Sequence, residues 1–182
     1  MHAPTSDIDV EIPASSFQDL VVAQIPRLRR YAHALTGDRN QGDDLVQECL
    51  ERAWGRRRQY QPSRPIRPWL FAILHNLHAN HARRRAAEPA MVPHDDPATA
   101  QSVAPEEPGE VELADLHRAL ASLAPAQRDV VLLVGLEQLS YRDAAATLGV
   151  PVGTVMSRLS RGRAQLRELL AGDEHRRGRR LR

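Results

Sequence analysis

The chain has 182 residues, of which 42% are hydrophobic and 26% charged, and its formal net charge is +2. This length is sufficient for one compact domain or two small ones, with enough apolar residues to form a core. The single cysteine excludes an internal disulfide and a cysteine-based zinc site, which is typical of a cytoplasmic protein. The longest apolar run, Trp69 to Leu74, excludes a membrane span, which needs roughly 20 residues, and the N-terminus does not resemble a secretion signal.

Charge is distributed in blocks along the chain. All 25 residues counted as lysine or arginine are arginines. The net charge is −4 over residues 1–24, +8 over 25–87, −8 over 88–117, +3 over 118–172 and +3 over 173–182. Two basic blocks separated by an acidic one predict two modules that face a polyanion, joined by a segment that avoids it.

Composition also predicts where the modules begin and end. Residues 88–110 contain five prolines and six acidic residues, with almost no large apolar side chains to offset the entropy of ordering. We therefore expect a flexible linker there. The predicted divisions are a disordered N-terminal arm (1–15), a first module (16–87), the linker (88–110), a second module (111–171) and a basic tail (172–182).

The first module is predicted to be helical. A short segment near 16–25 precedes a helix whose apolar stripe begins at Leu28 and which ends at Gly37. A second helix, at about 40–58, has an apolar stripe opposite an acidic and polar face. After a loop, Pro68 opens a third helix, 68–85, which ends in an arginine run. The apolar stripe of the second helix consists of Leu45, Val46, Cys49, Leu50, Ala53 and Trp54, and the third helix is expected to bury Trp69, Ile73 and Leu77.

The second module is predicted to contain a helix-turn-helix. Leucines from Leu113 to Leu123 mark one helix, and Pro125 opens another. Ser140 and Asp143 form a capping box, and a turn over 149–151 leads into a final helix at about 152–170. Small residues four apart before that turn are typical of the packing in a helix-turn-helix. Because no strand-like alternation occurs anywhere, the predicted fold class is all-α.

One face of the final helix has the side chains that suit the DNA major groove. At 100° per residue, Ser157, Arg158, Arg161 and Gln165 fall within about 60° of Thr154, beside the apolar face. Arginines can bind guanine edges, and hydroxyl groups can bind bases or phosphates. Two further arginines, Arg163 and Arg167, suit backbone phosphates. An ordinary solvated helix face is the alternative at this point.

Three segments, in order, resemble the extracytoplasmic-function (ECF) group of the sigma-70 family. Residues 42–54 resemble the polymerase-binding segment of sigma region 2. Residues 67–73, followed by Asn76 and the run 83–85, resemble the helix that melts DNA and reads the minus-ten element. Residues 139–145 and 149–159 resemble the region 4 signature. The resemblance covers about 16–170, so it implies two small helical domains and a sigma factor that directs promoter-specific transcription initiation.

The resemblance also implies partners and site residues. The partners are core RNA polymerase, through the coiled coil of its largest subunit and the flap of the second-largest, promoter DNA, and an anti-sigma factor in a signal response. It implies no catalytic activity, no cofactor and no membrane insertion. The implied polymerase-binding residues are Asp44, Gln47, Glu48 and Glu51. The implied minus-ten residues are Tyr60, Gln61, Ser63, Arg64, Asn76, Asn80, Arg83 and Arg84. The implied minus-thirty-five residues are Thr154, Met156, Ser157, Arg158, Ser160, Arg161 and Arg163.

Two positions depart from the family pattern. Met156 stands where many members have lysine or arginine, and Asn80 stands where many have aspartate. Both departures concern the promoter sequence that is read. An apolar residue at position 156 implies that a phosphate or base contact is missing or is replaced by an apolar contact.

Other interpretations of these residues remain open from the sequence alone. His75, His78 and His81 have a spacing that a metal site could use, but successive histidines rotate by about 300°, which favours a polar, DNA-facing surface. Cys49 is expected in the core rather than as a redox sensor, and Trp69 in the core rather than stacked on a base. Two alternative functions are a helix-turn-helix regulator that acts without polymerase and a sigma mimic that occupies a partner protein.

Overall fold

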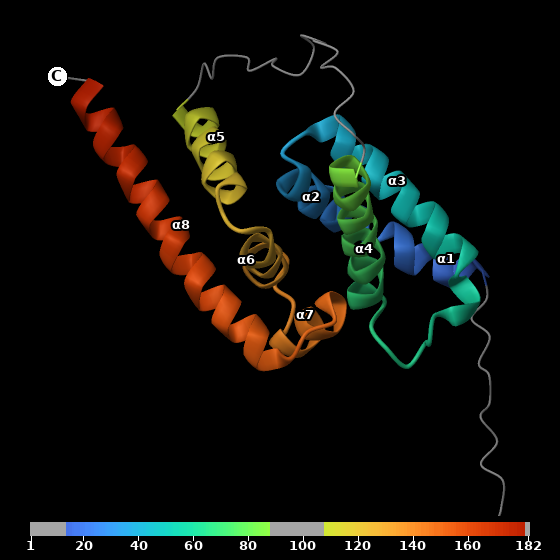
Figure 1. The fold of residues 1–182 in the computed structure, drawn as a ribbon. Coiled ribbons are helices and arrows are strands. Elements are labelled where there is room, and N and C mark those ends of the chain that lie inside the picture. Colours follow the sequence, from blue (N-terminus) through green and yellow to red (C-terminus); the bar gives the residue numbers. More distant parts are fainter. Residues whose placement is uncertain (1–13, 88–107, 181–182) are drawn as a thin grey trace, which may run out of the picture.

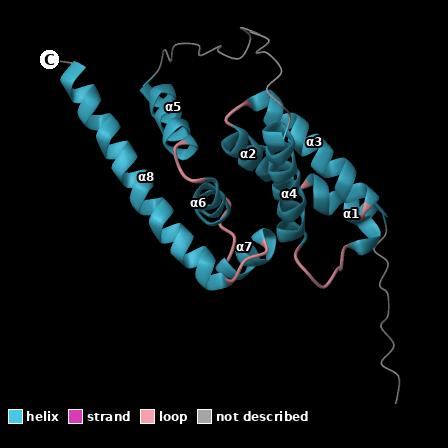
Figure 2. Ribbon diagram, viewed as in Figure 1, coloured by secondary structure: helices cyan, strands magenta, loops and turns pink. Residues whose placement is uncertain are grey.

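The computed structural model of the protein describes residues 14–87 and 108–180. Across these ranges all regular elements are helical (Figures 1 and 2), which confirms the all-α prediction. None of the described helices combines the length and apolar character needed to cross a membrane. Most of the predicted arm and linker lie outside the described residues.

The first module contains four α-helices and one short 3-10 turn. They are α1 (Ala14–Val22), α2 (Ile25–Thr36), α3 (Arg39–Gly55), η1 (Arg57–Gln59) and α4 (Ile66–Ala87). The helix predicted at 40–58 thus ends at Gly55, because the chain tightens into η1. The third helix begins two residues before Pro68, which falls in its first turn, where a missing N–H costs no hydrogen bond.

The core of the first module is formed where α2, α3 and α4 pack together. Leu28, Tyr31, Phe71 and Leu74 are all completely buried. The Tyr31 and Phe71 rings meet edge to face, with their centroids 5.1 Å apart. Cys49 is also fully buried, which confirms its predicted place in the core.

The second module contains the elements α5 (Pro108–Ala121), α6 (Pro125–Val130), η3 (Val131–Leu136), α7 (Tyr141–Leu148) and α8 (Val152–Arg180). In Figure 1, α5 lies alongside α8, and the two helices are in contact. The predicted end of the final helix at about residue 170 was wrong, since α8 continues to Arg180. Residues 171–180 contain no proline, the residue that most strongly interrupts a helix.

A π-helical turn replaces part of the helix that was predicted after Pro125. The Glu137 amide donates to the Leu132 carbonyl at 2.9 Å, five residues earlier, and the Leu139 amide donates to the Leu133 carbonyl at 2.9 Å. Such wide turns are rare and often occur at functional positions. The next residue, Gln138, has a φ of 54°, in the left-handed region. The turn therefore ends the helix abruptly and presents Glu137 on the side that faces α2.

The two modules pack directly against each other. Helix α7 packs on α4 (Figure 1), and η3 contacts α2. Buried apolar residues of both modules form one continuous core, from Phe17 to Leu159. The separate charge blocks of the sequence gave no sign of this contact.

Candidate nucleic-acid interface

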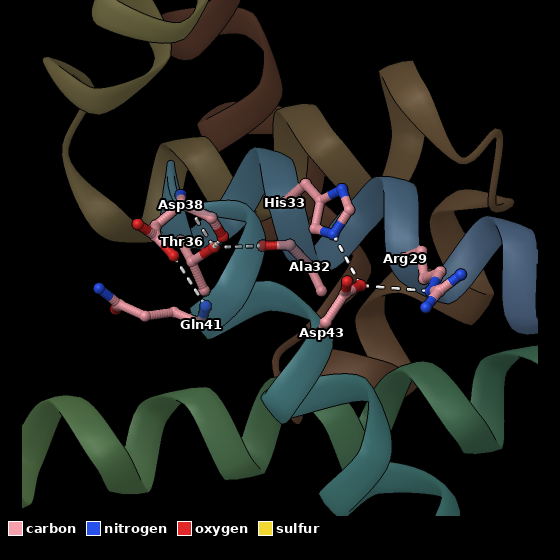
Figure 3. A network of polar contacts seen from close by, with 7 residues as sticks. All are labelled: Arg29, Ala32, His33, Thr36, Asp38, Gln41 and Asp43. Carbon is pink, nitrogen blue, oxygen red and sulfur yellow. Dashed lines mark hydrogen bonds and ion pairs between the residues drawn. The ribbon is translucent and has the colours of Figure 1, made fainter. Parts of the chain in front are cut away.

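The corner between α2 and α3 fixes the direction of α3. The Asp38 side chain caps α3 by accepting a hydrogen bond from the Gln41 amide at 2.8 Å. Thr36 Oγ1 donates to the Ala32 carbonyl at 2.9 Å and lies 2.8 Å from the Asp38 carbonyl oxygen. These groups lie on one side of the corner in Figure 3. The cap therefore gives one of the unpaired backbone amides at the start of α3 a hydrogen-bond acceptor.

On the other side of this corner, Asp43 links α3 back to α2. Figure 3 shows the Asp43 carboxylate between His33 Nε2 at 3.0 Å and Arg29 Nε at 3.2 Å. The two helices approach so closely here that a Cβ at Gly42 would lie 2.4 Å from His33 Cδ2. The side chains of Arg29, His33 and Thr36, on successive turns of α2, thus fix the orientation of α3.

The predicted polymerase-binding residues lie on the exposed face of α3. Asp44, Gln47 and Glu51 are exposed, and Gln47 Nε2 donates to Glu51 Oε1 at 3.2 Å. Glu48 is half-buried, and its carboxylate contacts Arg52 at 3.0 Å and His81 of α4 at 2.9 Å. The face is therefore an acidic, solvent-accessible strip, and Glu48 connects it to α4. The apolar stripe on the opposite face is buried except at Leu50, which is partly buried, and at Trp54. Trp54 is 44% exposed and has the Arg57 guanidinium 5.3 Å from its ring centroid.

The loop before α4 is held by aromatic packing. The Tyr60 ring lies 5.5 Å from Trp69 and 5.8 Å from Phe17, measured between centroids. Its hydroxyl donates to the Arg64 carbonyl at 2.7 Å, which closes the loop. Gln61, Ser63 and Arg64 are exposed. Tyr60 thus supports the loop, while the other three side chains are free to meet a ligand. Trp69 is half-buried against the core, as predicted.

Farther along α4, the other predicted minus-ten residues lie on its outward side. Asn76 is exposed and Asn80 half-exposed, and Arg83 Nη2 donates to Asn80 Oδ1 at 2.7 Å. Arg84 is exposed and borders a surface pocket of about 400 Å³ between α3 and α4, together with Asp44 and Glu48 of the acidic strip. At 1.5 Å per residue these amide and guanidinium groups extend over about 12 Å of the helix.

The histidines of α4 have separate partners. His75 faces the second module, with Nδ1 at 3.9 Å from Asp129 Oδ2, whereas His81 pairs with Glu48. Burial lowers the pKa of His78 to about 4, with a further contribution from Arg128. The prediction of a DNA-facing surface was therefore wrong for His75, which lies near Asp129 of α6, whereas His78 lines the surface pocket between α3 and α4. Burial likewise raises the pKa of the Cys49 thiol to about 12, which disfavours a reactive thiolate.

The helix-turn-helix of the second module forms as predicted. The Ser140 hydroxyl oxygen accepts from the Asp143 amide at 3.0 Å, and Ser140 Oγ donates to Asp143 Oδ2 at 2.7 Å. Gly149 ends α7 with a φ of 64°, the left-handed conformation that favours glycine. Ala145 of α7 and Val155 of α8 are buried, so the two helices meet through small and branched side chains.

The first turns of α8 present the predicted minus-thirty-five residues to solvent. Met156, Ser157, Ser160, Arg161 and Arg163 are exposed, while Thr154 and Arg158 are half-buried. Ser157 Oγ donates to the Thr154 carbonyl at 3.1 Å, and Arg161 Nε donates to the Ser157 carbonyl at 3.3 Å. The outward face of α8 therefore combines hydroxyl, guanidinium and thioether groups.

A buried carboxylate lies between the modules, and sequence analysis did not identify it. The Glu137 side chain is 0% exposed. Its Oε1 accepts from Arg30 Nε at 2.9 Å, and its Oε2 lies 3.7 Å from Arg67 Nη2 and 3.9 Å from Arg27 Nη1. All three arginines belong to the first module. One carboxylate of the second module thus interacts with three positively charged groups of the first.

Further polar contacts extend this interface. Thr147 Oγ1 of α7 donates to the Pro68 carbonyl of α4 at 3.4 Å. Burial raises the pKa of Asp129, and the nearby His75 and Arg128 partly offset this rise. The Tyr31 hydroxyl is buried and has no hydrogen-bond partner among the described residues. The available sequence signal was a glutamate directly after the apolar stretch 130–136, but its partners are about 70 to 110 residues away.

Comparison with known families gives two matches, which fall in the two packed modules. The family model "Sigma2 domain of PhyR" matches residues 21–75, and the model "Sigma-70, region 4" matches residues 113–166. The first match includes the acidic strip, the loop and the first half of α4. The second includes the helix-turn-helix and the outward face of α8.

Comparison with individual proteins covers nearly the whole chain. The ECF RNA polymerase sigma factor EcfG of Rhodopseudomonas palustris is 38% identical over 158 residues, which cover 87% of each chain. Among solved structures, the sigma factor RpoE of Bartonella quintana, in complex with the anti-sigma factor NepR, is similar with a TM-score of 0.74. It is 35% identical, and the match covers 87% of this chain and 98% of that one. CnrH, in complex with the cytosolic domain of CnrY, has a TM-score of 0.68 and 29% identity, with 88% and 91% covered. The chain therefore belongs to the ECF RNA polymerase sigma factor family.

Proposed function

We propose that three separate surfaces of the protein carry the binding functions of a sigma factor. As a member of its family it directs core RNA polymerase to promoters and initiates transcription there. In our proposal α3 docks on the polymerase, the loop 60–66 and α4 bind the minus-ten element, and α8 reads the minus-thirty-five element. The observation that carries this assignment is the position of the acidic strip of α3 beside the amide and arginine groups of α4.

Charge supports the assignment of α3 to protein rather than DNA. Asp44 and Glu51 are exposed carboxylates that a phosphate backbone would repel, whereas a basic or polar protein surface would bind them. The coiled coil of the largest polymerase subunit is the partner that the family implies. In this proposal Glu48 also fixes the position of α3 relative to α4 through its contact with His81.

The chemistry of the loop and of α4 supports single-strand binding. An unpaired base is held by polar groups and by stacking, and its phosphates are held by cations. The exposed side chains of the loop are those of Gln61, Ser63 and Arg64. The Tyr60 hydroxyl closes the loop through its hydrogen bond to the Arg64 carbonyl. Asn76, Asn80, Arg83 and Arg84 would hold the following nucleotides along the helix.

We further propose that an anti-sigma factor binds this chain. The related structures support this, because RpoE was solved in complex with the anti-sigma factor NepR and CnrH in complex with the cytosolic domain of CnrY. The flap of the second-largest polymerase subunit is the proposed partner of the second module. A non-catalytic role in the cytoplasm fits the family. The predicted arm, linker and tail remain proposals, and α5 begins at Pro108 inside the predicted linker while α8 extends to Arg180 inside the predicted tail.

The two alternatives from the sequence differ in how they use the first module. A regulator without polymerase has no use for the acidic strip. The mimic deserves a test, because the model that matches residues 21–75 is named for PhyR, and an anti-anti-sigma factor PhyR of Bartonella quintana is known in complex with NepR. That structure is 16% identical to this chain, so its similarity concerns the fold alone.

Reconstitution with bacterial core RNA polymerase separates these functions. The full chain should bind core polymerase and initiate at specific members of a promoter library. Asp44→Ala with Glu51→Ala should weaken polymerase binding at least tenfold, while the matched variant Glu168→Ala, which removes an exposed acid from α8, should bind normally. Core binding without initiation would indicate a mimic. Duplex binding without core binding would indicate a regulator.

A further inference from the structure

Two of the large apolar side chains that stay exposed lie in the first two turns of α8. Val152 is 41% exposed and Met156 53%. They are four residues apart, so they form one row on the helix surface. The core-facing residues Val155 and Leu159 lie on another side, with exposed fractions of 0% and 3%. The row therefore adds nothing to the core of the second module.

A polar row runs beside this apolar row. Ser157 and Arg161 are exposed and four residues apart, and Arg161 bonds back to the Ser157 carbonyl at 3.3 Å. Between the two rows lies Gly153, whose missing Cβ would meet open space. A partner can therefore approach the helix backbone closely at this point. It has to offer anionic or acceptor groups to one row and an apolar group to the other, since Met156 and Ser157, the neighbouring members of the two rows, lie about 100° apart around the helix.

The major groove of DNA offers this combination. Guanine O6 and N7 and the phosphates are acceptors for arginine and serine. The thymine 5-methyl is the apolar group that the groove presents, and the other three bases lack it. We propose that Met156, flanked by Val152, contacts thymine methyl groups in the promoter element that α8 reads, and so selects thymine there. This inference rests on the proposed function of α8.

The packed arrangement of the modules leaves this row accessible. Helix α7 lies against α4, yet Met156 remains among the most exposed apolar side chains of the described residues. The contact with thymine is thus available whether or not the modules separate. Its effect should appear as a preference at one or two adjacent base pairs, because the row is two residues long.

The experiment uses holoenzyme reconstituted from core polymerase and the full chain. A promoter selected from a library randomised over the minus-thirty-five element is prepared with each thymine of that element replaced in turn by deoxyuridine. This change removes the methyl group and leaves base pairing intact. At the contacted thymine we expect the apparent promoter affinity to fall roughly fourfold, the value for one buried methyl group.

Variants assign that loss to the side chain. In Met156→Ala, thymine and deoxyuridine should give equal affinities at this position. Met156→Lys should also lose the discrimination and should steepen the salt dependence by about one phosphate contact. The control Arg161→Ala should bind more weakly to both templates but keep the fourfold difference.

Two results would overturn the inference. One is a minus-thirty-five element at which no thymine is methyl-sensitive with the wild-type protein. The other is an unchanged thymine preference in Met156→Ala. In both cases initiation itself still occurs, so the proposed function stands. If the wild-type holoenzyme does not initiate on any library member, it is the proposed function that fails.

Discussion

Replacing Glu137 by glutamine should loosen the contact between the two modules. The substitution keeps the shape of the side chain but removes the charge that faces Arg27, Arg30 and Arg67. Burial lowers the pKa of Arg67, and the positive charge of Arg27 lowers it further, while Glu137 raises it. Without the carboxylate the repulsion among the guanidinium groups is uncompensated, and separation of the modules relieves it.

The magnitude follows from the geometry of the contact. The strongest single interaction is the hydrogen bond from Arg30 Nε to Oε1, at 2.9 Å. A hydrogen bond to a charged group contributes about 1.5–3 kcal/mol. The Arg27 and Arg30 side chains are 44% and 50% exposed, so water screens part of their attraction and places the loss in the lower half of that range. A loss of about 2 kcal/mol shifts the ratio of separated to packed modules roughly 30-fold.

Energy transfer between two dyes measures this ratio. Cysteines introduced at exposed positions, Gln18→Cys in α1 and Ala164→Cys in α8, place one dye on each module. Native Cys49 does not interfere, because it is fully buried and its pKa is raised to about 12. We expect Glu137→Gln to increase the population with low transfer efficiency, while thermal unfolding shows that both modules still fold.

A matched control separates this effect from a general change of charge. Glu168→Gln makes the same substitution at an exposed position of α8, and its transfer distribution should equal that of the wild type. Binding of α8 to a minus-thirty-five duplex should also be unaffected by Glu137→Gln, because the outward face of α8 is exposed in the packed form. An unchanged low-transfer population in Glu137→Gln would refute the reasoning that this carboxylate holds the modules together.

Three further predictions concern stability. Gln138→Gly should raise the free energy of unfolding by about 0.5–1 kcal/mol in urea titration, because glycine adopts the φ of 54° without strain. Gln138→Ala keeps a Cβ and should not show this gain, so an equal gain in both variants would contradict the explanation. Tyr31→Phe should leave the melting temperature unchanged or raise it, since it removes a buried hydroxyl without a described partner; a fall of several degrees would show that the hydroxyl is bonded. His78 has a pKa lowered to about 4 in the folded state, so the unfolded chain binds more protons between pH 4 and 6.5 and stability falls on acidification through that range. His78→Gln should flatten this slope; a slope equal to that of the wild type would argue against His78 as the source.

The sequence by itself determined the local structure and the family. Helix stripes, the Ser140 cap and the Gly149 turn depend on residues within a few positions of one another, so periodicity and capping chemistry were enough to predict them. Site residues of α3 and α8 could be proposed for the same reason, since exposure on a helix follows from its apolar stripe. The ordered motifs indicated the sigma family because each one specifies a helix and its charge.

Only the tertiary structure decided how the modules meet. The Glu137 cluster joins residues about 70 to 110 positions apart, and no local pattern specifies such a pair. The π-helical turn that positions Glu137 packs on α2, and it replaces part of the helix that was predicted after Pro125. The same packing moved His75 from an expected DNA-facing surface to a contact with Asp129 of the second module. Local rules set which face of a helix is apolar, but the free energy of burying one helix against another sets which polar groups on its border remain in water.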